Sequence, residues 1–208
     1  MTFNADAPAE LAFAVVAVCW LGFGLILALG KKRAAKSEAK RDVKSHLGFL
    51  LQCIAYAICF GFYRAYFSPF LPISKTAEEM LAALTIAIAV VSEWFCFVAA
   101  RTLGKQWALT ARLIEGHELI MHGPYAVVRN PIYLAMFGML LATGLAVSRW
   151  GALIIATIVF LVGNEIRIRS EERLLREAFG PKFADYARRV PTFLPRLRQG
   201  RASEGSRR

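Results

Sequence analysis

Two polar stretches of the sequence contain residue types that could bind a charged ligand or do chemistry. The first, residues 117–133, holds two histidines, two tyrosines, Arg129 and Asn130. Pro131 suits the first turn of a helix because it lacks an N–H, and Asn130 could cap that helix. The free N–H groups of such a helix end would favour an anionic group. The Gly-Pro and Asn-Pro pairs are also ordinary turn and cap signals, so a purely structural role is the alternative.

The second stretch places the amide of Asn164 among charges of both signs, on Glu165, Arg167, Arg169, Glu171 and Glu172. Arg167 and Glu171 are four residues apart and would share one face of a helix. Glu165 and Glu172 are seven apart and would also share a face. Such a mixed-charge pocket could recognise a zwitterion such as the amino-acid part of S-adenosylmethionine. The alternative is a set of interfacial ion pairs, which contribute little to stability.

These stretches lie among long apolar runs, which must form the elements that position them. Apolar residues make up 57% of the 208 residues, more than is usual in a soluble domain. A run of 19 residues spans roughly 28 Å as a helix, enough to cross the hydrocarbon core of a bilayer. We therefore predict an all-α polytopic membrane protein with about five transmembrane helices. They would be built on Leu11–Leu29, Leu47–Phe67, Met80–Ala100, Ile132–Val147 and Gly151–Val162.

The distribution of basic residues predicts the orientation of these spans. The net charge is +11, and alternate sides of the five spans carry 23 and 2 Lys or Arg residues, with Arg64 left inside a span. Because cytosolic loops are enriched in Lys and Arg, the N-terminus should lie outside and both polar stretches on the cytosolic side. This pattern favours an anionic membrane surface over nucleic acid as the partner of the basic residues.

Several polar residues fall within the predicted spans. Arg64, near the end of the second run, could extend to the interface. Glu93 in the third should face protein, a cavity or a partner, either as an interhelical bond or as part of a cofactor or substrate cavity. The cysteines fall in apolar runs and are expected to be buried free thiols: Cys19, Cys53, Cys59 and Cys96. The histidines show no metal-ligand spacing with cysteine, so we expect no metal site.

Three regions are expected along the chain. Residues 1–101 would form three spans with a basic cytosolic loop, residues 102–195 a region with a helical hairpin, and residues 196–208 a disordered basic tail. The charged segment after the last span should be helical until about Phe179. It should then become irregular around Pro181, Pro191 and Pro195.

The order of motifs around the predicted hairpin resembles the isoprenylcysteine carboxyl methyltransferase family and its phospholipid-methyltransferase relatives. The resemblance covers about half of the chain, from Leu103 to Pro195, and rests on the order of its pieces. The matching pieces are Gly123-Pro124-Tyr125, Arg129-Asn130-Pro131-Ile132-Tyr133, Arg167 to Glu171-Glu172, Phe179-Gly180, Phe183, Tyr186 and Arg189-Val190-Pro191. Asn130 replaces the usual histidine of the family, and Phe183 replaces a usual tyrosine.

This resemblance implies an S-adenosylmethionine-dependent methyltransferase. Its cofactor site would be lined by His117, Leu119, Ile120, Tyr125, Arg129, Asn130, Pro131, Tyr133 and Glu171. Arg167 would contact the methyl acceptor, and Arg167, Glu171 and Glu172 would form the catalytic set. The acceptor would be lipophilic or isoprenylated, and a carboxylate or thiol is favoured over a phospholipid amine, which needs deprotonation.

Two other functions fit parts of the sequence. The Arg-x-Pro-x-Tyr segment is similar to that of sterol reductases, which would imply an NADPH-dependent membrane reductase. A non-catalytic membrane adaptor would use the basic segments to bind anionic lipid. For the methyltransferase we expect an active site that faces the cytoplasm, in a prokaryotic inner membrane. The oligomeric state and the identity of the acceptor do not follow from the sequence.

Overall fold

Long apolar helices make up most of the structure, as expected for a chain whose backbone must satisfy its own hydrogen bonds in lipid. The computed structural model describes residues 7–33, 40–65, 74–107, 112–113 and 116–194. Within these residues the long helices are α1 (Ala7–Arg33), α2 (Lys44–Gly61), α3 (Lys75–Leu103), α4 (Pro131–Val147) and α5 (Trp150–Arg189).

Three of the described helical segments are long and apolar enough to cross a membrane. They are Ala7–Gly30, Lys75–Gln106 and Trp150–Arg189, and α4 is a shorter apolar helix. Large apolar side chains face outward from them, among them Leu21 at 77% and Val91 at 61% exposure, which suits contact with lipid. The protein is therefore an α-helical integral membrane protein, in agreement with the predicted class.

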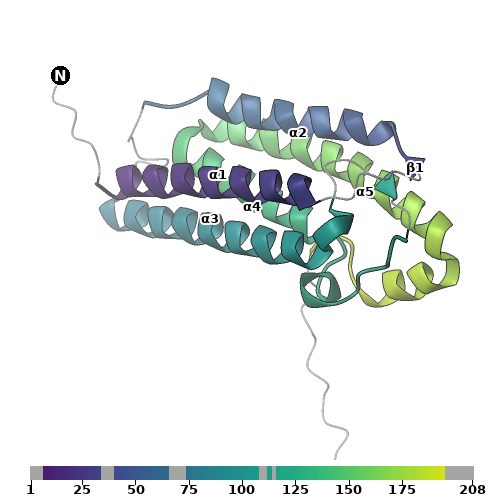
Figure 1. Ribbon diagram of the computed structural model, residues 1–208. Coiled ribbons are helices and arrows are strands. Elements are labelled where there is room, and N and C mark those ends of the chain that lie inside the picture. Colours follow the sequence, from purple (N-terminus) through teal and green to yellow (C-terminus); the bar gives the residue numbers. More distant parts are fainter. Residues whose placement is uncertain (1–6, 34–39, 66–73, 108–111, 114–115, 195–208) are drawn as a thin grey trace, which may run out of the picture.

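The helices pack in pairs around α4. Helix α1 lies beside α3 and α2 beside α5, with α4 between the pairs (Figure 1). Phe23 and Met139 are fully buried in a cluster that α1, α3 and α4 share. Leu140 and Phe160 anchor a second cluster among α2, α4 and α5. The single helix α4 thus contributes to both apolar cores.

Short polar elements gather at one end of the helices (Figure 1). They follow the ends of α1 and α3 and precede α2 and α4. They are β1 (Lys40–Arg41), the 3₁₀ helix η1 (Gly104–Gln106), β2 (Arg112–Leu113) and the 3₁₀ helix η2 (Gly123–Ala126). Strand β1 pairs antiparallel with β2, with Lys40 opposite Leu113. The connection after α1 is thereby joined to the long connection after α3.

The expected extent of the second helix was wrong. Helix α2 ends at Gly61 instead of Phe67, and Tyr63 then forms a β-bridge with Ser148; residues 66–73 lie outside the described residues. The Arg64 guanidinium donates to the backbone carbonyls of Leu145, Ala146 and Ser148, at 2.7 to 2.9 Å. These carbonyls lie at the end of α4, where intrahelical donors run out.

The expected end of the last helix near Phe179 was confirmed, because α5 breaks at Gly180, where φ is +48°. The expected irregular stretch around Pro181 was wrong, since a second helical piece follows and runs to Arg189. Glycine adopts this left-handed conformation at little cost. Pro181 then begins a second helical piece, a position where its missing N–H does no harm. The turn directs this piece back toward the polar connection between α3 and α4 (Figure 1).

Other residues predicted within the spans lie mostly as expected. All four cysteines are free and three are buried, but Cys53 is exposed on the outer face of α2, against the prediction. Glu93 lies against Gly22 of α1, where an added Cβ would come within 1.6 Å of the Glu93 Oε1 atom. The glycine thus leaves room for a carboxylate between α1 and α3. The predicted tail, residues 196–208, lies outside the described residues.

Candidate cofactor and acceptor site

The structure brings all the predicted site residues to one cavity at the polar end of the helices. They come from the connection before η2, from the start of α4 and from the middle of α5. The lining includes His117, Leu119, Ile120, Tyr125, Arg129, Asn130, Pro131, Tyr133, Arg167, Glu171 and Glu172. Residues up to 55 positions apart in the sequence therefore share one site.

The same cavity reaches into the apolar part of the bundle. Leu27 of α1, Phe49 of α2 and Met136 of α4 also line it, and none of them was predicted. Trp107, after α3, adds a buried indole. The cavity thus has a polar wall and an apolar wall, a combination that suits a polar cofactor beside a lipid-linked acceptor.

The charged centre of the cavity joins α4 to α5. The Tyr133 hydroxyl donates to Glu171 Oε2 at 2.8 Å. The Arg167 guanidinium carbon lies 4.6 Å from the centre of the Tyr133 ring and 5.5 Å from that of Phe49. A cation over aromatic faces is held electrostatically by the rings. Arg167 and Glu171 thus share one helix face, as their spacing predicted, with Tyr133 between them.

A side chain that sequence reasoning missed also contacts Arg167. Arg167 Nη1 donates to Gln52 Oε1 of α2 at 2.5 Å, and Gln52 Nε2 donates to Asn164 Oδ1 at 3.2 Å. The helices approach closely here, since a Cβ at Gly48 would lie 2.5 Å from the Gly163 carbonyl oxygen. The signal was present in the sequence, because Gln52 is an amide inside an otherwise apolar run.

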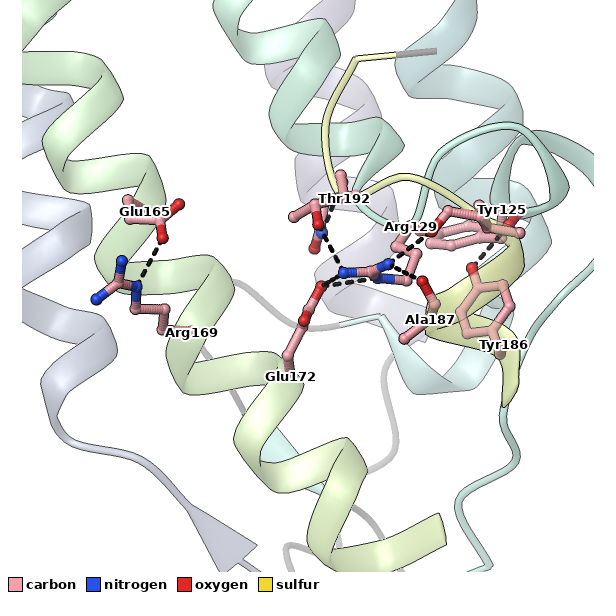
Figure 2. A network of polar contacts seen from close by, with 10 residues as sticks. Tyr125, Arg129, Glu165, Arg169, Glu172, Tyr186, Ala187 and Thr192 are labelled. Atoms are coloured by element: carbon pink, nitrogen blue, oxygen red, sulfur yellow. Dashed lines mark hydrogen bonds and ion pairs between the residues drawn. The ribbon is translucent and has the colours of Figure 1, made fainter. Parts of the chain in front are cut away.

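Arg129 forms a dense polar cluster with the C-terminal segment (Figure 2). Its Nε donates to Glu172 Oε1 at 2.8 Å, and its Nη2 donates to Thr192 Oγ1 at 2.6 Å. Its Nη1 donates to the carbonyls of Ala187 and Val190. These bonds occupy much of the guanidinium of Arg129 and one carboxylate oxygen of Glu172. Both residues therefore join the segment after α5 to the wall of the cavity.

Two further bonds fix this segment, and one corrects a prediction. The Asn130 side chain does not cap α4; its Nδ2 donates to the Thr192 carbonyl at 2.9 Å. The Tyr186 hydroxyl donates to the Tyr125 carbonyl at 2.7 Å (Figure 2). Asn130 precedes α4 but turns toward the C-terminal segment because that segment offers an acceptor.

The predicted mixed-charge pocket divides between two faces of α5. Asn164, Arg167 and Glu171 face the neighbouring helices, whereas Glu165 and Arg169 pair with one another at 2.6 Å and stay exposed. Figure 2 shows this pair apart from the Arg129 cluster. A helix of 3.6 residues per turn cannot direct all six side chains to one side. The alternative of surface ion pairs was therefore right for Glu165 and Arg169.

His117 offers a polar atom toward a ligand. Its Nδ1 atom is buried and, among the residues that the structure describes, has no hydrogen-bond partner. Burial lowers the pKa of His117 below its usual value, so the ring is neutral at pH 7. Burial, together with the negative charge of Glu171, raises the pKa of Tyr125 well above its usual value, which keeps this phenol protonated.

These groups fit the parts of S-adenosylmethionine. The buried Nδ1 of His117 could hydrogen-bond to a ligand, and the Glu171 carboxylate could accept from hydroxyl or amino groups. Leu119 and Ile120 line the cavity and offer apolar contact to the adenine ring of the cofactor. Buried polar atoms normally find a partner, so the open position at His117 supports a ligand at this wall.

Part of the chain matches a known family. Residues 80–182 match the family model "Phospholipid methyltransferase", a stretch that contains α4, most of the cavity lining and the body of α5. These residues, just under half of the chain, are thus similar to that family. The predicted resemblance is confirmed, and this family is one of methyltransferases.

Several curated relatives each match part of the chain. The cobalt-zinc-cadmium resistance protein CzcN of Cupriavidus metallidurans is 35% identical over 48% of this chain and 46% of its own length. The nickel-cobalt-cadmium resistance protein NccN of Alcaligenes xylosoxydans is 35% identical over 54% and 53%. A protein-S-isoprenylcysteine O-methyltransferase of Schizosaccharomyces pombe is 30% identical over 39% and 34%. The chain thus spans about half the length, or less, of these relatives.

Proposed function

We propose that this protein is an S-adenosylmethionine-dependent methyltransferase that acts on a lipid-linked or isoprenoid acceptor, with a carboxylate as the methylated group. One observation carries the proposal. Residues that the family pattern assigns to the cofactor and the acceptor come from separate segments and line a single cavity. That cavity has an apolar wall of Leu27, Phe49 and Met136 among the long helices, as a lipophilic acceptor would require.

The residues would divide the work between cofactor and acceptor. His117, Tyr133 and Glu171 would bind the polar parts of S-adenosylmethionine, which when bound supplies a methyl group activated by its positive sulfur. Arg167 would orient the acceptor carboxylate, since guanidinium and carboxylate form strong paired hydrogen bonds. The main contribution of the protein is then to hold the two reactants in line and close together. Glu172, paired with Arg129, would support the wall of the site.

The acceptor class follows from proton chemistry. A carboxylate is ionised at neutral pH, so a carboxylate acceptor would need no general base. A phospholipid amine would first have to lose a proton. His117, His122 and the glutamates are the groups near the site that could accept it. We therefore favour a carboxylate such as that of an isoprenylated cysteine.

The membrane arrangement is part of the proposal. We propose that α1 to α5 provide five spans, with the N-terminus outside and the cavity open to the cytoplasm. The excess of Lys and Arg at the polar end of the helices supports this orientation. S-adenosylmethionine would enter from the cytosol, and the acceptor laterally from the bilayer. A prokaryotic inner membrane suits the short spans and few loops.

A transfer assay with a labelled methyl donor tests the proposal. Detergent-purified protein would be incubated with S-[methyl-³H]adenosylmethionine and either N-acetyl-S-farnesylcysteine or phosphatidylethanolamine vesicles. A carboxyl methyl ester releases labelled methanol in base, whereas an N-methyl group does not. Base-labile label in the farnesylcysteine product is expected. Label confined to the phospholipid would contradict the carboxylate acceptor, and NADPH-dependent reduction of a sterol without any methyl transfer would favour the reductase.

A further inference from the structure

A buried amide on α2 holds the arginine proposed to bind the acceptor. Gln52 is 1% exposed, and its neighbours Asn164 and Arg167 are each 3% exposed. Gln52 lies outside the matched residues 80–182 and outside every motif of the sequence. A fully buried polar side chain in an apolar helix is costly unless it is hydrogen-bonded, and such residues in membrane spans are often functional.

The orientation of the Gln52 amide follows from its partners. A guanidinium has only donors, so the atom of Gln52 that faces Arg167 must be the oxygen. The amide nitrogen then faces Asn164 and donates to its Oδ1 atom at 3.2 Å. Asn164 thus fixes the amide, and the amide oxygen fixes Nη1 of Arg167 at 2.5 Å.

Other contacts restrain the remaining freedom of the guanidinium. The rings of Tyr133 and Phe49 lie near it, on α4 and α2. The Tyr133 hydroxyl is itself bonded to Glu171. The close approach of α2 to α5 at Gly48 and Gly163 allows a glutamine side chain to reach this centre. Gln52 is therefore among the side chains that set the position of Arg167.

The chemistry of an amide differs from that of a carboxylate at this point. A glutamate would form an ion pair with Arg167 and offset its positive charge. Glu171 already interacts electrostatically with Arg167, so a second carboxylate would place two negative groups around one guanidinium. A glutamine offers the same hydrogen bond without adding charge, which preserves the attraction of Arg167 for an anion.

We propose that Gln52 is a positioning residue that holds Arg167 and preserves its charge for an anionic acceptor. This inference rests on the proposed function and deepens it, because it assigns the choice of an anionic acceptor to a residue outside the family motifs. Asn164 acts with Gln52 by fixing the direction of its amide.

The test compares an anionic acceptor with its neutral analogue. Gln52→Glu and Gln52→Met would be measured with N-acetyl-S-farnesylcysteine as acceptor and its carboxamide as inhibitor. Cys53→Ser, an exposed neighbour on the same helix, is the matched control. Calorimetry with S-adenosylmethionine reports whether each variant keeps its cofactor site.

For Gln52→Glu we expect the KM of the carboxylate acceptor to rise about tenfold, the size of a lost charge-assisted contact. The carboxamide inhibition constant and the S-adenosylmethionine Kd should change less than about threefold. Gln52→Met should lower kcat, because Arg167 loses its alignment, and raise KM less than Gln52→Glu does. Cys53→Ser should match wild type.

If Gln52→Glu raised the KM of the carboxylate acceptor and the inhibition constant of the carboxamide by the same factor, the inference would be contradicted. Gln52 would then have only a structural role. A wild-type KM and kcat in both Gln52 variants would contradict it as well. If the wild-type protein methylates the probe, either result leaves the proposed function standing. A wild-type protein that bound no S-adenosylmethionine would overturn the proposed function and this inference with it.

Discussion

The two sides of the cavity hold their arginines in different ways. Arg129 donates to a carboxylate, a hydroxyl and two backbone carbonyls, all from α5 or the segment after it. Arg167 donates to a neutral amide and lies against two aromatic rings. The first set of contacts joins parts of the chain, and the second positions a cation beside a cavity. Two arginines in one family pattern thus have different physical roles.

The largest effect should come from Arg167. In Arg167→Ala, methyl transfer to farnesylcysteine should fall by about a hundredfold or more, since truncating one partner of a buried charge contact costs 2–5 kcal/mol. Binding of S-adenosylmethionine, which relies on other residues, should stay near wild type. The labelled-methyl assay and calorimetry measure the two quantities. Transfer near the wild-type rate would remove Arg167 from the acceptor site.

Arg129 should instead affect the fold. Removing it leaves Glu172, at 16% exposure, without its ion pair, and we expect Arg129→Ala to lower the free energy of unfolding by about 3 kcal/mol. Trypsin should then cleave at Arg188 and Arg189 faster, because the C-terminal segment loses its main contacts. Cofactor binding and transfer should fall together.

Glu165→Ala is the matched control for that comparison. The exposed pair of Glu165 with Arg169 contributes at most about 0.5 kcal/mol, so thermal unfolding in detergent should not change. A stable, trypsin-resistant Arg129→Ala protein that had lost only cofactor binding would reverse the assignment. Arg129 would then be a ligand of the cofactor, as the family resemblance implied.

A smaller effect is expected from the protonation of His117. Because burial lowers the pKa of this imidazole, it is neutral from pH 8 down to its ordinary pKa of about 6.5. Affinity for the cationic S-adenosylmethionine should be constant over that range and decline at lower pH, where a positive charge develops beside the ligand. His117→Gln should bind with a flatter pH profile. An equal decline in the variant would assign the titration to another group.

The smallest effect concerns the ion pair between Asp42, which precedes α2, and Arg173 of α5. Burial alone would raise the pKa of Asp42, but the Lys44 N–H, Ser170 and Arg173 outweigh it and lower the pKa below its usual value. Folding thus favours the ionised form of Asp42. The ionised carboxylate stabilises the folded protein fully above the ordinary carboxyl pKa, and this stabilisation is lost as the pH falls through the lower pKa of the folded state. Asp42→Asn should cost about 1 kcal/mol at pH 7.

The pH dependence provides the check on Asp42. The difference in melting temperature between Asp42→Asn and wild type should shrink as the solution becomes strongly acidic, below the ordinary carboxyl pKa of about 3.9. A difference that stayed constant from pH 7 to pH 3 would show that the loss comes from packing and not from charge.

Features set by local sequence were predictable. Apolar runs gave the positions of the long helices, and the order of short motifs identified the residues that now line one cavity. Arg167 and Glu171 share a face because four residues is close to one helical turn. The all-α membrane class and the family resemblance were therefore both correct from the sequence.

Features that depend on distant partners were not predictable. Asn130 turns away from its helix because the Thr192 carbonyl lies within reach, and Arg64 binds the end of α4 for a similar reason. Gln52 acquires its role only because Gly48 and Gly163 let two helices approach. The chain becomes helical again after the break at Gly180, because Pro181 suits the first turn of a new helical piece.

The central claim is that this cavity binds a methyl donor. Its most direct test is calorimetric titration of S-adenosylmethionine into the detergent-purified protein, with NADPH in parallel and Glu171→Ala as the variant. Saturable binding of S-adenosylmethionine alone, lost in Glu171→Ala, is the predicted result. Binding of NADPH in its place, or of neither compound, would contradict the account and favour a reductase or a non-catalytic adaptor.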